Sequence, residues 1–537
     1  MKFFQRSNII NDGNCMPRSK KTKDSFKRDN EGRAILGSAK EMAEWVKLGF
    51  KEQDDKRDSD IPFKRHYIDL SHCVLYISYP VGSNEPVSKI FNLCDMAGVV
   101  PGIKKIEEGM SYLFEVEYDL HLEGSVLYGN FFHYVKFDGM VRMDNVTINS
   151  NFSCFKCLFL DYVYMQHLHV TGRSDFEQCE FKDGLVMNGA DADLFLFNNC
   201  TVKERLWLSS ASLNNQSIKG YHQSIEITNC SVDNLELSKI NTAGLPIYMG
   251  DSTITGMHID NVSLDSSLCF NSCRLVGVMT MVIDEGGRNN KIKELVFQSC
   301  EIDGQYHIEN TDIEKFEFNF CKIGDKGRLR LSQCGVKELT SGCSSVFGQM
   351  DVLDNSVSTL CLEGTCVQGY LNFQGNEVEN FADRQTLRLL KNEARKVNDD
   401  VEATRLYAKE MRLLLADKKV PFWDKVSLWL NKLFSGYGES WSRALWVTAL
   451  LSIVLTVLML GLGSTRFGFN LSGGVMGVGK FVTVLLDSIN VFSIPLFSDT
   501  IEKYGLNVFG QILYFFIKIV VAYGTYQFVM AFRKYGR

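Results

Sequence analysis

A short unit of hydrophobic residues recurs through the central part of the chain and limits what the chain can fold into. Each unit has an apolar residue, two variable residues, a small or apolar residue, one variable residue and a further apolar residue, and units follow about every 10 to 12 positions. Clear examples are Phe176/Cys179/Phe181, Phe197/Cys200/Val202 and Phe318/Cys321/Ile323. The last two members share a strand face, because side chains alternate with period 2, and the variable pair marks a turn. The pattern predicts an all-β solenoid in which two units form a coil of roughly 21 residues.

Cysteine occupies the small position of many units. The 537-residue chain has 16 cysteines, and a thiol suits that position because it is small and tolerates burial. Asn355 and Asn376 occupy the same position, where stacked side chains could bond to one another. The first residues, Met1 to Arg18, contain no apolar stretch long enough for a signal peptide. We therefore expect the solenoid to stay in the cytosol with reduced thiols.

The remaining sequence divides into further segments. An amphipathic helix is expected near Ala39 to Leu48, and the period changes from strand to helix at Asp383. Asp399 and Glu402 have capping-box spacing, which predicts a helical hairpin. The expected domains are a polar N-terminal segment (1–66), a small β-rich cap (67–120), the β-solenoid (121–380), the helical hairpin linker (383–418), a juxtamembrane segment (419–443) and a transmembrane domain (444–537).

Two segments of the last domain are long and apolar enough to span a membrane. Residues 444–463 carry no charge, and residues 506–532 carry one, at Lys518. Basic residues flank the pair on both outer sides, so both termini should be cytoplasmic in a multi-pass protein of the inner (plasma) membrane. The tryptophans at the entry to the first span suit a lipid interface. They are Trp423, Trp429, Trp441 and Trp446.

The loop between the two spans bears on transport. Residues 479–486 could form a half-helix too short to cross, and Pro495 should end any helix beyond them. Residues 479–497 could therefore be a re-entrant pore element or an extracytoplasmic interfacial loop. The pore-loop candidates are Asp487, Ser488, Asn490 and Ser493.

Lys518 lies near the middle of the second span, where an ammonium group is costly unless it faces water or a partner. It belongs to a helical stripe of polar and small residues, the pore-lining candidates. These are Gln511, Tyr514, Lys518, Ala522 and Thr525. Three interpretations of Lys518 stay open. The first is a pore-facing ring, which would disfavour cations if no carboxylate compensates it. The others are a pair with Asp487, or a side chain that extends to the interface from a span whose true position differs.

The C-terminal third carries a family resemblance. The motifs Gly436-Tyr-Gly-Glu-Ser-Trp-Ser-Arg443, Leu390-Lys-Asn-Glu-Ala with Glu402-Ala-Thr-Arg-Leu-Tyr-Ala-Lys-Glu410, and Phe532-Arg-Lys-Tyr-Gly-Arg537 resemble those of bacterial pentapeptide-repeat membrane proteins. Those proteins carry a two-helix domain similar to potassium-channel pores, which implies a lipid-embedded homo-oligomer, by analogy a tetramer. The chain departs from the pattern because it lacks the Thr-Val-Gly-Tyr-Gly filter and because its solenoid units are longer than five residues.

Other motifs suggest no chemistry. Cys154 and Cys157 form a CxxC without a second metal-spaced pair, and His167 and His169 share a strand face without metal-spaced partners. The glycine-rich residues 473–479 lack the Lys-Ser/Thr of a phosphate loop, which favours a flexible loop. We expect no metal, no cofactor and no enzymatic activity. A net charge of −6 also argues against nucleic-acid binding.

Three functions remain open. The first is an oligomeric, ion-channel-like pore gated by a solenoid that senses a cytosolic protein or ligand. The second is a non-conducting, membrane-tethered scaffold, and the third is a defence effector that permeabilises the membrane. The stripe around Lys518 and the loop after Gly479 favour conduction, because an anchor needs neither.

Overall fold

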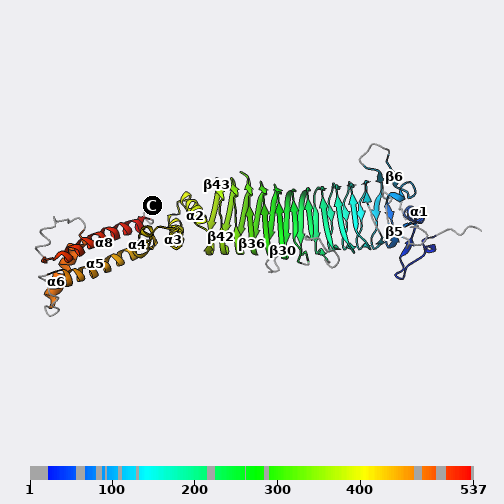
Figure 1. Ribbon diagram of the computed structural model, residues 1–537. Coiled ribbons are helices and arrows are strands. Elements are labelled where there is room, and N and C mark those ends of the chain that lie inside the picture. The colour runs from blue at the N-terminus through cyan, green and yellow to red at the C-terminus, as the bar shows by residue number, and fades with distance from the viewer. Residues whose placement is uncertain are drawn as a thin grey trace, which may run out of the picture. The chain divides into compact units, whose positions relative to one another are not determined.

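The computed structural model describes most of the chain (Figure 1). The described residues are 22–55, 67–75, 77–79, 88–90, 93–106, 112–128, 132–213, 224–242, 244–260, 262–282, 290–464, 474–490 and 504–533. They fall into two compact units, Met1–Lys337 with Ser344–Ser356, and Glu338–Cys343 with Val357–Arg537.

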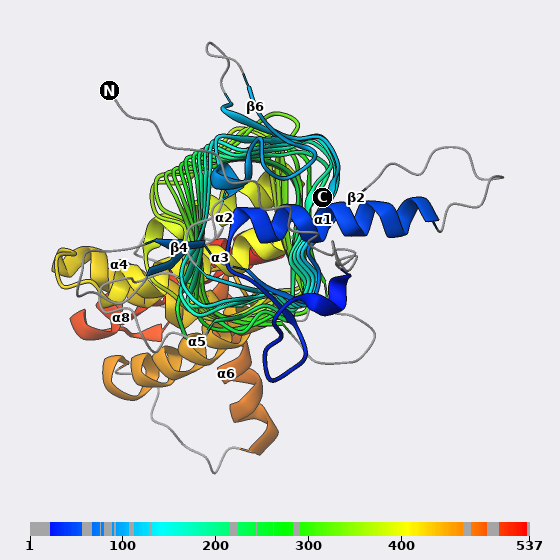
Figure 2. The ribbon, with the colours of Figure 1, turned by 90° about the vertical axis from the view of Figure 1, so that its right-hand side faces the viewer.

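A β-solenoid of about 11 coils occupies residues 114–381, which confirms the predicted fold class. Equivalent strands of successive coils pair in parallel to form three long sheets (Figure 2). The 12-stranded sheet consists of β10 (Phe132–His133), β14 (Phe152–Phe155), β18 (Arg173–Glu177), β22 (Leu194–Asn198), β26 (Ile225–Thr228), β28 (Ile247–Gly250), β30 (Ser263–Asn271), β33 (Asn290–Gln298), β36 (Thr311–Asn319), β39 (Gly335–Thr340), β42 (Ser356–Cys361) and β45 (Glu377–Phe381).

The coil length is close to the predicted one, with two insertions. Asn151 and Arg173 occupy equivalent positions 22 residues apart, and Cys334 and Asn355 do so 21 residues apart. A longer step of 30 residues joins Asn198 to Thr228. The insertions include residues 214–223 and 283–289, which lie outside the described part. These segments explain why the repeat loosens in the sequence.

The parallel ladders also continue toward the N-terminus. Strand β1 (Ala34–Leu36) pairs with β3 (Cys73–Leu75), which pairs with β9 (Val126–Leu127). Strand β2 (Tyr67–Asp69) pairs with β8 (Asp119–His121). The predicted amphipathic helix is confirmed as α1 (Ala39–Asp55), which starts at the expected residue and extends further.

The corners of the coils depend on left-handed residues. A residue with φ between 54° and 58° directly precedes the small position in units such as Gln178-Cys179, Asn199-Cys200, Ser299-Cys300 and Phe320-Cys321. This conformation turns the chain sharply, and asparagine adopts it at lower cost than most residues. The two variable residues of each unit therefore contain the turn, as the pattern predicts.

The cysteine position does more than fill space. The backbone N–H of Cys200 donates to Cys230 Sγ at 3.3 Å, and Cys230 Sγ lies 3.5 Å from the carbonyl oxygen of Phe197. Serine and asparagine repeat this arrangement in later coils. The N–H of Cys334 donates to Asn355 Oδ1 at 2.9 Å, and Asn355 Nδ2 donates to the Leu331 carbonyl at 3.0 Å. Each small polar side chain thus satisfies backbone groups of the preceding coil, which burial would otherwise leave unpaired.

Stacked aromatic rings fill part of the solenoid interior. Phe137, Phe159 and Phe181 lie one above the other, with ring centroids 4.7 Å apart and interplanar angles of 3° and 4°. That spacing equals the distance between neighbouring strands. The hydrophobic members of the repeat therefore form continuous columns.

Thiol alkylation under native conditions tests this register. Cys179, Cys200, Cys300 and Cys321 are at most 2% exposed, whereas Cys343 and Cys366 are exposed. Burial also raises the pKa of a solenoid thiol such as Cys334, to about 12, so little reactive thiolate forms near neutral pH. N-ethylmaleimide followed by mass spectrometry should find Cys343 and Cys366 modified first. Rapid modification of the four buried thiols would contradict the register.

The helical part of the second unit begins with a hairpin. Helices α2 (Arg384–Lys396) and α3 (Asp400–Ala416) are capped by Asp383 and Asp399, as the capping-box spacing predicts for the second. Thr386 of α2 accepts from the N–H of Leu362 at 2.7 Å. Thr386 therefore accepts the same kind of backbone hydrogen bond that Ser, Cys and Asn side chains accept between coils. Helix α2 covers the end of the last coil.

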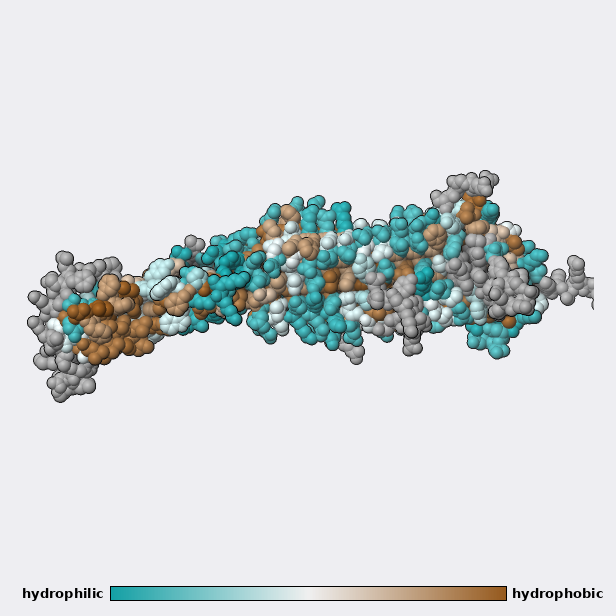
Figure 3. Space-filling model, viewed as in Figure 1, coloured by the Kyte–Doolittle hydropathy of each residue, from teal (hydrophilic) through white to brown (hydrophobic). Residues whose placement is uncertain are grey.

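Further helices complete the second unit. Helix α4 (Phe422–Ser435) is followed by α5 (Trp441–Gly463) and α8 (Val508–Phe532), with the shorter α6 (Gly474–Ile489) between the last two. Helices α5 and α8 are each long and apolar enough to cross a membrane. The apolar surface over them is extensive (Figure 3). This arrangement confirms two apolar helices at the C-terminal end and indicates membrane association.

Candidate functional site

Glycine allows α5 and α8 to pack closely as antiparallel neighbours. A Cβ added to Gly463 would lie 2.3 Å from Gly510 Cα, and one added to Gly524 would lie 1.9 Å from Thr448 Oγ1. Near the first contact, the N–H of Asn507 donates to the Gly463 carbonyl at 2.8 Å. Small residues are the usual means by which helices approach in a membrane, where apolar side chains gain little by leaving lipid.

Hydroxyl groups on α5 face the same interface without remaining unpaired. Thr448, Ser452 and Thr456 each donate to the carbonyl four residues earlier, at 2.6 to 2.7 Å. Ser452 and Thr456 are at most 1% exposed. Internal bonds of this kind let polar side chains lie inside an apolar medium.

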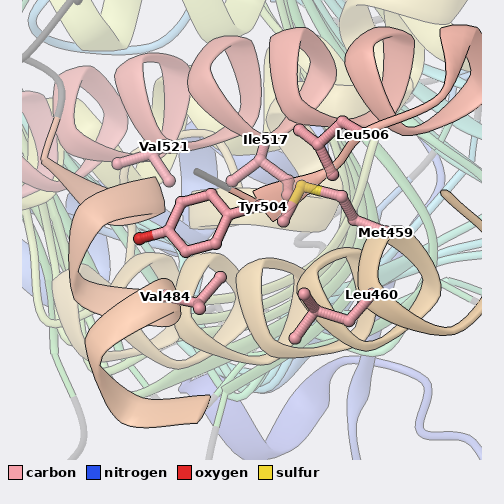
Figure 4. Close-up of a cluster of buried hydrophobic side chains, with 7 residues drawn as sticks. All are labelled: Met459, Leu460, Val484, Tyr504, Leu506, Ile517 and Val521. Atoms are coloured by element: carbon pink, nitrogen blue, oxygen red, sulfur yellow. The ribbon is translucent and has the colours of Figure 1, made fainter. Parts of the chain in front are cut away.

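Helix α6 packs into the hairpin formed by α5 and α8. Figure 4 shows Val484 of α6 facing Leu460 of α5, with the Tyr504 ring between α6 and α8. The buried cluster contains Met459, Leu460, Val484, Tyr504, Leu506, Ile517 and Val521. The cluster therefore combines all three helices in one core.

Lys518 holds the C-terminal end of α6. Its Nζ donates to the carbonyl oxygen of Asp487 at 2.9 Å and to that of Asn490 at 2.6 Å. The last carbonyls of a helix lack intrahelical partners and carry partial negative charge, so an ammonium group suits them. The same Nζ lies 5.2 Å from the centre of the Tyr514 ring. Lys518 is thus a C-terminal cap for another helix.

This contact fixes the depth that α6 reaches. Lys518 comes ten residues after Val508, which begins α8, so it lies about 15 Å along the helix at 1.5 Å per residue. That is near the middle of a helix of 25 residues. If α8 spans the bilayer, the C-terminal end of α6 lies near mid-bilayer.

The Asp487 carboxylate has a separate partner. Tyr504 donates its hydroxyl to Asp487 Oδ2 at 2.5 Å, so two side chains secure the same turn of α6. Lys518 contacts Asp487 through the main-chain carbonyl, which differs from the carboxylate pair considered from the sequence. Tyr504 and Val484 were not anticipated, because neither belongs to a polar pattern.

The other predicted site residues lie along α8 and at the end of α6. Tyr514 and Gln511 are half-buried, and Gln511 Nε2 donates to the Leu506 carbonyl at 3.3 Å. Ala522 and Thr525 are exposed on α8. Ser488 is buried, Asn490 follows α6, and Ser493 lies outside the described residues. The pore-lining assignment of this stripe stays a prediction.

The glycine-rich prediction is wrong for residues 474–479. These residues form the first turns of α6, which begins at Gly474, whereas the sequence favoured a flexible loop. Glycine lowers helix propensity in water. In an apolar medium a helix pairs its own backbone groups, which outweighs that cost.

Helix α4 is an amphipathic element that the sequence did not show as a helix. Phe422, Trp423 and Trp429 are 54% to 78% exposed on it. Its other end is buried: Phe434 meets the Tyr523 ring edge-on at 5.0 Å, and Ser435 Oγ donates to Gln527 Oε1 at 2.7 Å. An amphipathic helix with exposed tryptophans suits a lipid–water boundary.

The α2–α3 hairpin is locked by a buried carboxylate. Glu410 is 2% exposed, and its oxygens lie 2.7 Å from Arg388 Nε, 2.6 Å from Lys391 Nζ and 3.7 Å from Arg384. Burial by itself raises the pKa of Glu410, but the bonds from Lys391 and Arg388 outweigh burial and hold the pKa below its usual value.

Substitution of Glu410 tests how much these ion pairs stabilise the hairpin. Glu410→Gln should destabilise the hairpin by roughly 3 kcal/mol, because it leaves three basic groups around a neutral side chain. Since the folded pKa is depressed, the stabilisation is present above the unfolded pKa of about 4.3 and is lost as pH falls through the lower folded value. Hydrogen exchange of α2 and α3 between pH 7 and 3 measures this. Glu402, a half-exposed residue that pairs with Arg405, is the control, and Glu402→Gln should have little effect.

The remaining sequence motifs show structural contacts. Cys154 and Cys157 are both buried in the solenoid. His167 is a left-handed corner residue, and His169 Nδ1 lies 3.0 Å from Asp191 Oδ2 on the surface. Within the described ranges, no cluster of three or more His, Cys, Asp or Glu side chains is placed to hold a metal ion.

Comparisons of the whole chain with protein-family models, with curated proteins and with solved structures each gave no match. The similarity to pentapeptide-repeat membrane proteins therefore remains a resemblance of motifs, and function has to be argued from the geometry.

Proposed function

We propose that this chain is a subunit of an oligomeric ion-conducting pore in which α5, α6 and α8 form the membrane part and the solenoid is a cytosolic sensing domain. The observation that carries the proposal is the C-terminal end of α6, held level with the middle of α8 by Lys518. Two helices and an intervening half-spanning helix are the elements of a pore with re-entrant segments.

The cost of this arrangement supports a role beyond anchoring. A charged side chain in the middle of a spanning helix is rare and costly, and such residues mark functional sites by default. Two apolar helices would tether the solenoid without α6 and without Lys518. The exposed Ala522 and Thr525 give α8 a small, polar strip that a second copy or a water-filled path could face.

Topology and gating belong to the same proposal. Lys425, Lys432 and Arg443 before α5, and Arg533 after α8, favour a cytoplasmic location for both termini of an inner-membrane protein. The hairpin closes the last coil through Thr386 and is rigidified by Glu410. A cytosolic protein or ligand on the solenoid would act on the pore through this hairpin.

Ion flux into liposomes tests the proposal. The purified full chain, reconstituted with an ion-sensitive dye inside the vesicles, should give flux well above that of empty liposomes, and mass photometry in nanodiscs should show more than one copy per particle. A chain ending at residue 436 is the control, because it lacks α5 and α8. Full insertion of the intact chain with flux equal to that of empty liposomes would support a tethered scaffold instead.

A further inference from the structure

A pocket of about 390 Å³ lies where the hairpin, α4 and the last turns of α8 meet. Arg395 lies in the last turn of α2, Thr404 and Tyr407 come from α3, and Tyr526 and Arg533 come from the end of α8. Tyr437 lines it from the turn between α4 and α5. The volume falls in the range of small-molecule sites. Lys518 is not among the described residues that line this pocket.

The charge of the pocket is positive on balance. Among the described residues, Arg395 and Arg533 line it, against one carboxylate, Asp400. Within the described part of the chain, neither guanidinium forms an ion pair, although most arginines of the hairpin do. Arg395 and Arg533 are solvent-exposed residues at the rim of one cavity. Two such guanidinium groups are suited to oxygens of an anion, and to phosphate above all, because its geometry allows paired bonds.

Tyr437 contributes to the wall of the pocket but not to its donors. The residue is 2% exposed, and its hydroxyl oxygen has almost no accessible surface and no hydrogen-bond partner among the described residues. The two arginines are therefore the cationic donors of the pocket, and Tyr437 gives the pocket its shape.

The backbone around Tyr437 is also set in an uncommon way. Gly436, Tyr437 and Gly438 all have positive φ, of 62°, 67° and 87°. Glycine adopts this conformation freely, whereas a bulky tyrosine does so at a cost. The fold accepts that cost, and the Tyr437 side chain lies in the protein interior.

We propose that this pocket binds a phosphate-bearing anion, through the guanidinium groups of Arg395 and Arg533. The anion bridges the α2–α3 hairpin and the end of α8. The phosphate can belong to a phospholipid headgroup or to a soluble phosphorylated compound, because both present the same oxygens. This inference does not depend on ion conduction.

Binding to the full chain in nanodiscs separates the two sources. One arm compares phosphatidylcholine nanodiscs with nanodiscs that contain phosphatidylglycerol, by native mass spectrometry of retained lipid. The other adds inorganic pyrophosphate to phosphatidylcholine nanodiscs, by isothermal titration at low salt. Saturable binding in the first arm alone assigns the site to a lipid headgroup, and in the second alone to a soluble phosphorylated compound.

Variants show whether the pocket is responsible. Arg395→Gln with Arg533→Gln should weaken binding at least tenfold, since each removes charge-assisted bonds. Lys418→Gln with Lys419→Gln, an equal change of charge at exposed positions outside the pocket, should leave binding within twofold. Tyr437→Phe removes only a buried hydroxyl and should leave binding within twofold.

Three results would overturn the inference. They are no saturable binding of either probe, wild-type binding by the double arginine variant, and equal losses in the arginine and lysine variants. None of these binding experiments measures ion flux, so a negative result would not bear on the proposed pore.

Discussion

Lys518→Met should release the end of α6 and abolish ion flux. The substitution keeps the length of the side chain but leaves the carbonyls of Asp487 and Asn490 without their shared donor. Each bond to a charged group is worth about 1.5–3 kcal/mol, so the membrane unit should lose roughly 3 kcal/mol or more. Unfolding by SDS titration measures the stability, and the liposome assay measures the flux.

Two companion variants separate positioning from pore lining. Lys518→Arg retains charge and donors and should retain most of the stability. Lys518→Glu with Asp487→Lys should not recover it, because the contact involves the main-chain carbonyl of Asp487 rather than its carboxylate. Unchanged stability of Lys518→Met with altered ion selectivity would instead make Lys518 a pore-facing residue.

Gly463→Val should prevent α5 and α8 from packing. Its Cβ would lie 2.3 Å from the Cα of Gly510, and neither backbone can move without separating the helices. We expect a loss on the order of 3 kcal/mol or more, the upper range for overpacked sites. Size-exclusion chromatography and SDS titration in detergent measure it.

Gly461→Val provides a matched control on the same helix. A Cβ at Gly461 would meet nothing within 4 Å, so this variant should behave as a surface substitution and change stability by about 0.5 kcal/mol or less. Equal effects of the two substitutions would mean that the close contact at Gly463 does not hold the helices together.

Much of the fold follows from local pattern. The apolar repeat specifies which side chains point inward, because the period of a strand is 2, and it indicated the coils and the buried cysteines. The apolar lengths indicated α5 and α8, and the spacing of Asp399 and Glu402 indicated α3. What the repeat could not show is that Cys230 or Asn355 bonds to the backbone of the preceding coil.

Long-range contacts account for what the sequence missed. The partner of Lys518 is a main-chain carbonyl, which has no sequence signature. The ion pairs of Glu410 with Arg388 and Lys391 join two helices, so the sequence alone did not indicate them. Tyr437 belonged to a motif to which the sequence assigned no role. Gly463, Gly510 and Gly524 carried a usable signal, because small residues in apolar helices favour close packing.

All proposals for the membrane unit depend on α6 entering the bilayer, and spin labelling tests that depth directly. Leu486, 61% exposed near the end of α6, and Val478, 65% exposed near its start, would each be changed to Cys in a background whose other reactive thiols are serine. Ile453, 40% exposed midway along α5, and Val278, 56% exposed on the solenoid, serve as controls for lipid and water.

The measurement is power saturation with oxygen, which partitions into lipid, and with a nickel chelate, which stays in water. The structure predicts that a label at Leu486→Cys is as deep as one at Ile453→Cys, and that a label at Val478→Cys is shallower. A label at Leu486→Cys as accessible to nickel as one at Val278→Cys would place α6 outside the membrane and contradict the half-spanning helix.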